Sequence, residues 1–129
     1  MTNKTLTNLV LTGALALGGA GCLGTRHDEY HFSGKIGEEQ IEFSESPNYY
    51  WNTLKVVKAD GSTIAYEDNR GDDLKLDFIC ILPKENTTSC YYADSKNPAV
   101  KPIMEQAQKQ FDDYLAKILE INTAPLRNP

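Results

Sequence analysis

Apolar residues change their spacing once along this chain, close to Pro98. Between Tyr30 and Tyr92 they alternate with polar residues, a period of two that is typical of β-strands with one face in water. From Val100 to Ile121 they follow a 3-4-4-3-4-3 spacing, which is typical of an amphipathic helix. The apolar stripe of that helix needs an apolar partner, and the sheet offers one. We therefore predict an α+β fold, an antiparallel β-meander of about six strands with one C-terminal amphipathic helix packed on one face.

The hairpin that turns at Asp60-Gly61 has two conceivable registers. A two-residue turn puts Leu54 opposite Glu67. A three-residue loop over residues 59–61, with Gly61 in the left-handed conformation, creates two apolar pairs on one face, Leu54 with Tyr66 and Val56 with Ile64. Since a slip of one residue moves every side chain to the other face of the sheet, we predict the three-residue loop.

Prolines limit the helix at its start. Asn97 is a suitable N-cap, and Pro98 suits the first helical position. Pro102 lacks a backbone N–H, so it costs an interior hydrogen bond if the helix begins that early. Either the helix begins at Pro102 or its first turn is irregular. We expect residues 30–122 to form one domain and residues 123–129 to form a frayed, disordered tail.

The first 21 residues have the order of an export signal. Lys4 supplies a positive charge, a mostly apolar run follows from Leu6, and small residues lead to Cys22. The sixteen residues from Leu6 to Gly21 reach only about 24 Å as a helix, whereas the hydrocarbon core needs about 30 Å. We therefore predict a cleaved signal peptide over residues 1–21 and a protein that works outside the cytoplasm.

Cys22 is the predicted lipid attachment site. Gly19-Ala20-Gly21-Cys22 resembles the lipobox of prokaryotic lipoproteins, although Gly19 stands where that pattern prefers Leu. The resemblance implies diacylglycerol on the Cys22 thiol and a protein anchored on the extracytoplasmic side of the membrane, with residues 22–29 as a short tether. The alternative is ordinary signal-peptidase cleavage among the same small residues, which yields a secreted protein.

The two other cysteines are expected to form a disulfide. Cys80 ends an alternating run with Leu74, Leu76 and Phe78, and Cys90 lies in the strand that returns after Pro83. Pairing Cys80 with Cys90 also pairs Phe78 with Tyr92 on the same face, and a disulfide persists in an oxidising compartment. Closing this eleven-residue loop stabilises the fold by roughly 2–3 kcal/mol. Two buried free thiols are the alternative.

The net charge of the chain argues against a nucleic-acid partner. Without Lys4 the chain keeps 12 basic and 18 acidic residues, a net charge of −6. Nucleic-acid binding needs a clustered basic face, so we expect no nucleic-acid partner.

Four segments carry a resemblance to known proteins: residues 30–40, 57–61, 73–76 and 107–115. They resemble a group of uncharacterised small secreted or lipoprotein-like archaeal proteins. The resemblance covers most of the chain after the leader. It implies architecture and location and carries no activity.

Metal binding is not expected from the sequence. His27 and His31 lie in a segment that we interpret as a strand, where residues four apart are about 13 Å from each other, too far for one metal ion. Four acidic residues lie close to one predicted turn: Glu67, Asp68, Asp72 and Asp73. Acidic oxygens at a hairpin tip bind Ca²⁺ in some proteins. Their spacing does not match a calcium loop, so we expect a solvated turn, no metal and no cofactor.

Two features remain as candidate sites. Asn86-Thr87-Thr88 is an N-glycosylation sequon in the loop between the cysteines, with Asn86 as acceptor. Tyr49 and Trp51 are expected to point away from the core, on the same side as Val57, Thr63 and Ala65, because Tyr50 points inward in the chosen register. An exposed aromatic patch usually indicates a partner, here a protein or a glycan. The alternatives are a face covered by loop or tether residues, and a register wrong by one.

Catalytic motifs are missing from the sequence: it has no Gly-x-Ser-x-Gly elbow and no phosphate-binding glycine loop after the leader. The carboxylates are expected at turns or on the polar side of the helix, where burial does not tune their pKa. We therefore expect a membrane-tethered, non-enzymatic binding or envelope-surface module. The alternative is a small secreted, disulfide-stapled inhibitor or scaffold that presents residues 84–88 to a partner.

Overall fold

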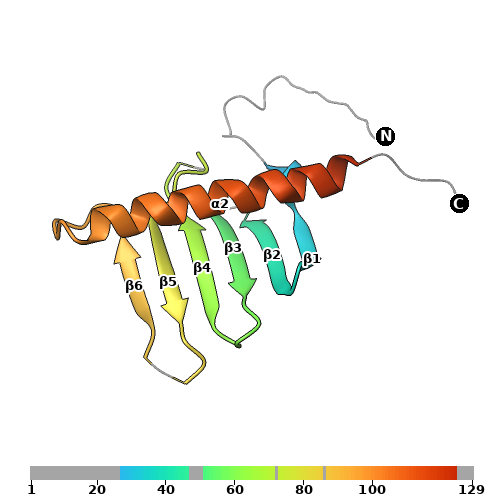
Figure 1. Cartoon of the computed structure of the whole chain (residues 1–129). Coiled ribbons are helices and arrows are strands. Elements are labelled where there is room, and N and C mark those ends of the chain that lie inside the picture. The colour runs from blue at the N-terminus through green and yellow to red at the C-terminus, as the bar shows by residue number, and fades with distance from the viewer. Residues whose placement is uncertain (1–26, 47–50, 72, 86, 125–129) are drawn as a thin grey trace, which may run out of the picture.

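The computed structural model describes residues 27–46, 51–71, 73–85 and 87–124. They form a six-stranded antiparallel sheet with the strands in sequence order, and a long helix that crosses one face of it (Figure 1). The α+β meander with a C-terminal helix is confirmed. The elements are η3 (Asp28–Tyr30), β1 (Phe32–Ile36), β2 (Glu39–Ser46), β3 (Trp51–Val57), β4 (Thr63–Asp68), β5 (Phe78–Leu82), β6 (Ser89–Tyr92) and α2 (Val100–Thr123).

The β3–β4 hairpin has the predicted register. Leu54 lies opposite Tyr66 and Val56 opposite Ile64. The Lys58 N–H donates to the Ser62 carbonyl at 2.8 Å and closes a three-residue loop, in which Gly61 has a φ of 90°. A side chain at this φ is strained, so glycine is the residue that suits the position.

The core lies between α2 and the covered face of the sheet. Phe111, at the middle of α2, is fully buried and contacts the rings of Phe43 and Tyr66 at centroid distances of 6.5 and 6.1 Å. The buried apolar side chains come from both layers: Ile41, Phe43, Leu54, Val56, Tyr66, Leu76, Ile79, Met104, Ala107, Phe111, Leu115 and Ile118. A two-layer arrangement therefore buries the helix stripe against the sheet, as the period change predicts.

The start of α2 settles the role of its prolines. The helix begins at Val100, so Pro102 is its third residue. The first N–H groups of a helix have no intrahelical acceptor, and the missing N–H of Pro102 therefore costs nothing. Asn97 accepts the Ala99 N–H at 3.0 Å and organises the turn before the helix. At the other end Ile121, expected on the buried stripe, is 47% exposed.

The fifth strand is shorter than its alternating pattern indicates. β5 begins at Phe78, and Leu74 has a φ of 61°, which no strand residue adopts. The Leu74 N–H donates to Asp68 at 2.8 Å, and the Leu76 N–H donates to Gln108 of α2 at 2.8 Å. These contacts hold residues 69–71 and 73–77 outside the strands. Within β5 it is Ile79 that is buried.

The N-terminal part of the described chain differs from the prediction. Residues 28–30 form a short 3₁₀ helix, η3, instead of a strand, and His27 is buried. The last residues of the predicted tether therefore belong to the folded domain. The predicted signal peptide, Cys22, the first part of the tether and residues 125–129 lie outside the described residues. No helix among the described residues is long and apolar enough to cross a membrane.

Candidate binding face

The sheet has one face under α2 and one face that no described helix covers. We call the second one the open face. Because successive side chains of a strand point to opposite faces, the open face carries the residues directly before and after each buried one in the sequence. Three of its apolar side chains are strongly exposed: Trp51 at 39%, Leu82 at 39% and Tyr92 at 49%. Large exposed side chains of this kind, here on β3, β5 and β6 of one face, are the usual sign of an interaction surface.

The open face has an apolar half and a polar half. Over β1 and β2 it carries Ser33, Lys35, Gln40, Glu42 and Ser44. From β3 to β6 most of its residues are apolar: Trp51, Val57, Ala65, Phe78, Cys80, Leu82, Cys90 and Tyr92. Thr53, Lys55, Thr63 and Glu67 lie among them. Apolar residues therefore predominate over β3 to β6 and polar residues over β1 and β2.

Trp51 is held in place on the open face by a neighbouring strand. Its Nε1–H donates to Glu67 Oε1 at 2.8 Å, and the Thr53 hydroxyl donates to the same oxygen at 2.6 Å. The carboxylate satisfies the polar tip of the indole and leaves its apolar ring toward solvent. A fixed aromatic ring loses little entropy when a partner packs on it.

A pair of aromatic rings lies on the same face, on β5 and β6. Phe78 and Tyr92 are opposite each other on β5 and β6, with ring centroids 5.3 Å apart and planes 31° from parallel. The predicted disulfide is present in the next pair of residues on the open face, where Cys80 lies opposite Cys90. It ties the edge strand β6 to β5 and so fixes the place of Tyr92.

The predicted site residues have different outcomes. Trp51 points outward, and Val57, Thr63 and Ala65 lie on the same face as predicted. Tyr49 and Asn86 lie outside the described residues. The sequence interpretation missed that Leu82, Phe78 and Tyr92 lie on the same face as Trp51, two and three strands away from β3. The signal for this was the alternation in β5, where Ile79 and Ile81 face α2 and Phe78, Cys80 and Leu82 face the other side.

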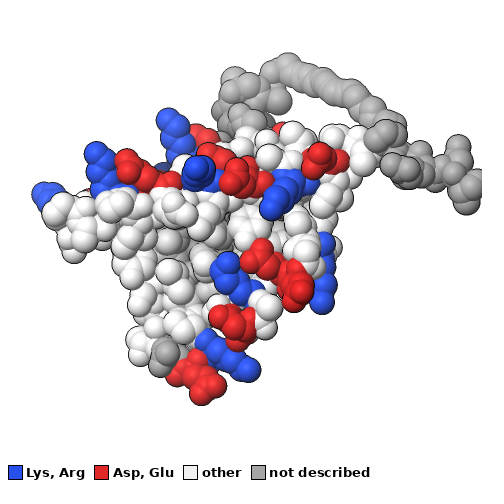
Figure 2. Space-filling view, in the orientation of Figure 1, with Lys and Arg blue, Asp and Glu red and all other residues white. Residues whose placement is uncertain are grey.

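The helix covers only part of the sheet face on which it packs. Beside α2, a groove of about 410 Å³ is lined by Ile64, Ile81 and Ile103 and by Gln106 and Gln110. Figure 2 shows that the surface around it, below α2 and over β4 to β6, carries few charges, whereas charges gather on α2 and toward β2 and β3.

Asp68 is buried, against the prediction. The sequence places it in a solvated turn, but its side chain is fully buried at the end of β4. Its Oδ2 accepts hydrogen bonds from Asn52 Nδ2 at 2.9 Å and from the Leu74 N–H at 2.8 Å. Burial raises the pKa of Asp68 to about 6. The expectation that burial tunes no carboxylate in this chain is therefore wrong for Asp68.

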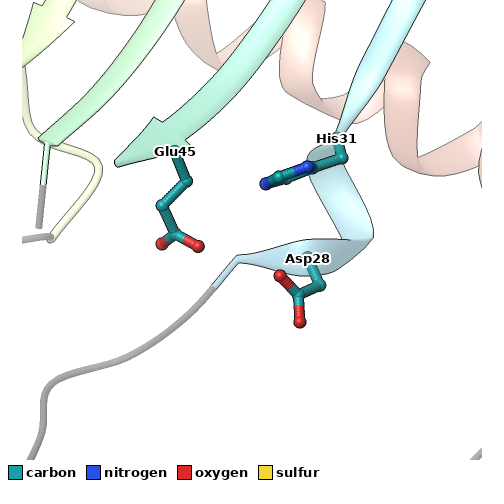
Figure 3. Close-up of side chains that lie close together, drawn as sticks. All are labelled: Asp28, His31 and Glu45. Atoms are coloured by element: carbon teal, nitrogen blue, oxygen red, sulfur yellow. The ribbon is translucent and has the colours of Figure 1, made fainter. Parts of the chain in front are cut away.

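A group of chemically active side chains lies at the N-terminal end of the sheet. Ligand atoms of Asp28, His31 and Glu45 lie within 4.8 Å of one another (Figure 3). The sequence interpretation missed this group because it treated residues 27–31 as a strand, in which these side chains do not converge on one point.

No protein-family model, no curated protein and no solved structure matches this chain. The resemblance to small secreted archaeal proteins therefore stays a prediction, and the geometry of the chain's own residues carries the functional argument.

Proposed function

We propose that this protein is a non-enzymatic, extracytoplasmic binding module, held at the membrane by a lipid on Cys22, that docks a partner protein on the apolar half of its open face. The observation that carries the proposal is the exposed group of Trp51, Leu82 and Tyr92 on a face that no described helix covers. The disulfide between Cys80 and Cys90 supports the location, since such bonds persist in oxidising compartments.

The shape and chemistry of the patch favour a protein as the partner. Trp and Tyr are enriched at the centres of protein–protein interfaces, where each buries a large area at small entropic cost. The Glu67 oxygen that could bind a sugar hydroxyl already accepts two hydrogen bonds, from Trp51 and Thr53. Apolar packing is therefore the main contribution that this face offers, and a glycan is the competing occupant.

Site-specific photocrosslinking in the native membrane tests the docking face. A photoreactive side chain at Leu82 reports on the apolar half, and the same group at Glu42 is the matched control on the polar half of the same face. We expect a discrete protein adduct from position 82, lost when Trp51→Ala is added, and none from position 42. Equal adducts at both positions, no adduct at position 82, or release of the bound partner by a glycosidase would contradict the proposal.

The intact mass of the protein from the membrane fraction tests the anchor separately. We expect a chain that begins at Cys22 and carries the mass of a diacylglycerol. A soluble chain of unmodified mass would refute the anchor and leave the docking face to be judged by the crosslinks.

A second candidate is a secreted inhibitor that presents the loop between β5 and β6. The described residues of this loop, Lys84, Glu85, Thr87 and Thr88, are exposed, and the disulfide closes its base. The double variant Lys84→Ser and Thr88→Ala separates the two candidates, because it changes exposed side chains of the loop and leaves Trp51, Leu82, Tyr92 and the disulfide in place. Loss of partner binding in this variant favours the loop.

A further inference from the structure

We propose that Asp28, His31 and Glu45 form a binding site for a divalent transition-metal ion, with zinc as the best match, which ties the chain that enters the fold to the end of β2. This site lies at the N-terminal end of the domain and is independent of the docking face.

The local backbone explains why the three side chains converge. A 3₁₀ helix has three residues per turn, so residues three apart lie above each other on one side. Asp28 begins η3 and His31 follows its last residue, which places both on the side that faces β2. Glu45 extends from the end of β2 toward them, as Figure 3 shows.

The distances suit a metal ion after a small adjustment. The ligand atoms lie within 4.8 Å of one another. Tetrahedral zinc with bonds of about 2.0–2.1 Å brings its ligands to roughly 3.4 Å from each other. Asp28 and His31 are exposed, so rotation of their side chains can close this gap without moving the backbone. One imidazole nitrogen and two carboxylate oxygens match zinc better than Ca²⁺ or Mg²⁺, which prefer oxygen ligands alone.

The surrounding residues hold the group in place from two sides. Glu45 is only 8% exposed, and its carboxylate accepts the His27 N–H at 3.1 and 3.2 Å. On the other side, Asn122 of α2 donates to the carbonyl oxygens of Glu29 and His31 at 2.7 and 3.1 Å. These contacts fix the Glu45 side chain and the backbone of residues 29 and 31, so only the side chains of Asp28 and His31 need to adjust when a metal binds.

A bound metal ion joins Glu45, at the end of β2, to Asp28 and His31 in and after η3. The predicted consequence is a domain whose first turn is fixed relative to β2 when metal is bound.

Calorimetric titration of the metal-stripped full chain with zinc tests the site. The background carries Cys22→Ser, because a free thiol also binds zinc. We expect one equivalent of zinc to bind, with affinity reduced about 100-fold in both His31→Gln and Glu45→Gln, since even outer-shell changes cost 10–100-fold. Glu42→Gln, an exposed carboxylate on the opposite face of the same strand, is the control and should bind as the parent does.

Thermal unfolding with and without zinc supplies a second measurement. Zinc should raise the midpoint of the parent and of Glu42→Gln but leave His31→Gln unchanged, because only a ligand bound to the folded state stabilises it. If Glu45→Gln fails to fold, His31→Gln at its exposed position decides the question. No saturable binding, or equal binding in the parent and both ligand variants, would overturn the proposal.

Discussion

Asp68 is the carboxylate whose ionisation the fold opposes most. It is fully buried, and its neighbours Asn52 and Leu74 donate to only one of its oxygens. Burial raises its pKa to about 6, from an ordinary value of 3.8. Between these two values the unfolded chain has lost the proton and the folded chain keeps it. The free energy of unfolding that depends on Asp68 therefore falls as the pH rises through this window, by at most about 3 kcal/mol.

The variant Asp68→Asn tests this contribution. Asn has no charge to desolvate. The free energy of unfolding of the variant, minus that of the wild type, should therefore increase by up to about 3 kcal/mol from about pH 4 to about pH 7, which means that the variant gains stability relative to the wild type. Urea denaturation at the two pH values gives the difference, in which the titration of all other groups cancels. Glu42→Gln, which removes an exposed charge on β2, serves as the control. A difference that does not vary with pH would show that Asp68 ionises freely.

Glu39 has the opposite dependence on pH. The Tyr114 hydroxyl donates to Glu39 Oε1 at 2.6 Å, and this hydrogen bond is the largest cause that holds the pKa of Glu39 below its ordinary value; Lys58 adds to it at 3.2 Å. A lowered pKa in the folded state means stabilisation that is present above the unfolded value and is lost as the pH falls through the folded one.

Tyr114→Phe removes that hydrogen bond and keeps the ring. We expect the free energy of unfolding to fall by about 1 kcal/mol near pH 7. The loss should shrink in acid, where Glu39 is protonated in both proteins. Urea denaturation across the acid range measures it. Tyr92→Phe, on the exposed edge strand, is the control and should change nothing measurable. A loss of equal size at every pH would mean that the Tyr114 hydroxyl acts independently of the Glu39 charge.

At the scale of elements, the β5–β6 hairpin depends on its disulfide more than on packing. β6 is a four-residue edge strand, and three of its residues are exposed. Replacing both Cys80 and Cys90 by Ala removes the constraint that the disulfide places on the unfolded chain. We expect the free energy of unfolding to fall by about 2–3 kcal/mol, with the other five strands retained. Urea denaturation measures the loss, and hydrogen exchange locates it. Uniform loss of protection across all strands would contradict this local role.

The elements differ in how well the sequence predicts them. The β3–β4 register follows from apolar pairs such as Leu54 with Tyr66, and α2 follows from its own periodicity, so both are local in origin. η3 has three residues and shows no periodicity that a sequence pattern can display. The phase of β5 depends on Gln108 of α2, which accepts the Leu76 N–H from 32 residues away in the sequence. Such contacts exist only in the folded chain, and for this reason the alternating pattern around Leu74 was misleading.

At the scale of the whole molecule, the same limit applies to the candidate site. Trp51 could be placed because its strand carries a clear alternation. Leu82 and Tyr92 join it on the same face only through the order of strands in the sheet, since Leu82 lies on β5, two strands from β3, and Tyr92 on β6, three strands from β3. The group of Asp28, His31 and Glu45 depends on a turn and a strand end that meet in space. Local patterns therefore identify single residues, and the topology assembles them into a surface.

The two faces of the sheet are expected to divide stability and binding between them. Phe111 lies between the layers and is fully buried, whereas Leu82 and Tyr92 on the open face are 39% and 49% exposed. Phe111→Ala should lower the free energy of unfolding by about 3–5 kcal/mol. The double variant Leu82→Ser and Tyr92→Ser should lower the free energy of unfolding by less than about 1 kcal/mol. It should nevertheless abolish the crosslink to the partner. Because position 82 is changed, the photoreactive group for this measurement replaces Thr63 on the same face. Apolar residues that a protein keeps in water without gaining stability from them indicate a surface used for recognition. If the double variant unfolds as readily as Phe111→Ala, the open face is part of the core of a larger assembly of this chain, and a size measurement of the native protein would then show it.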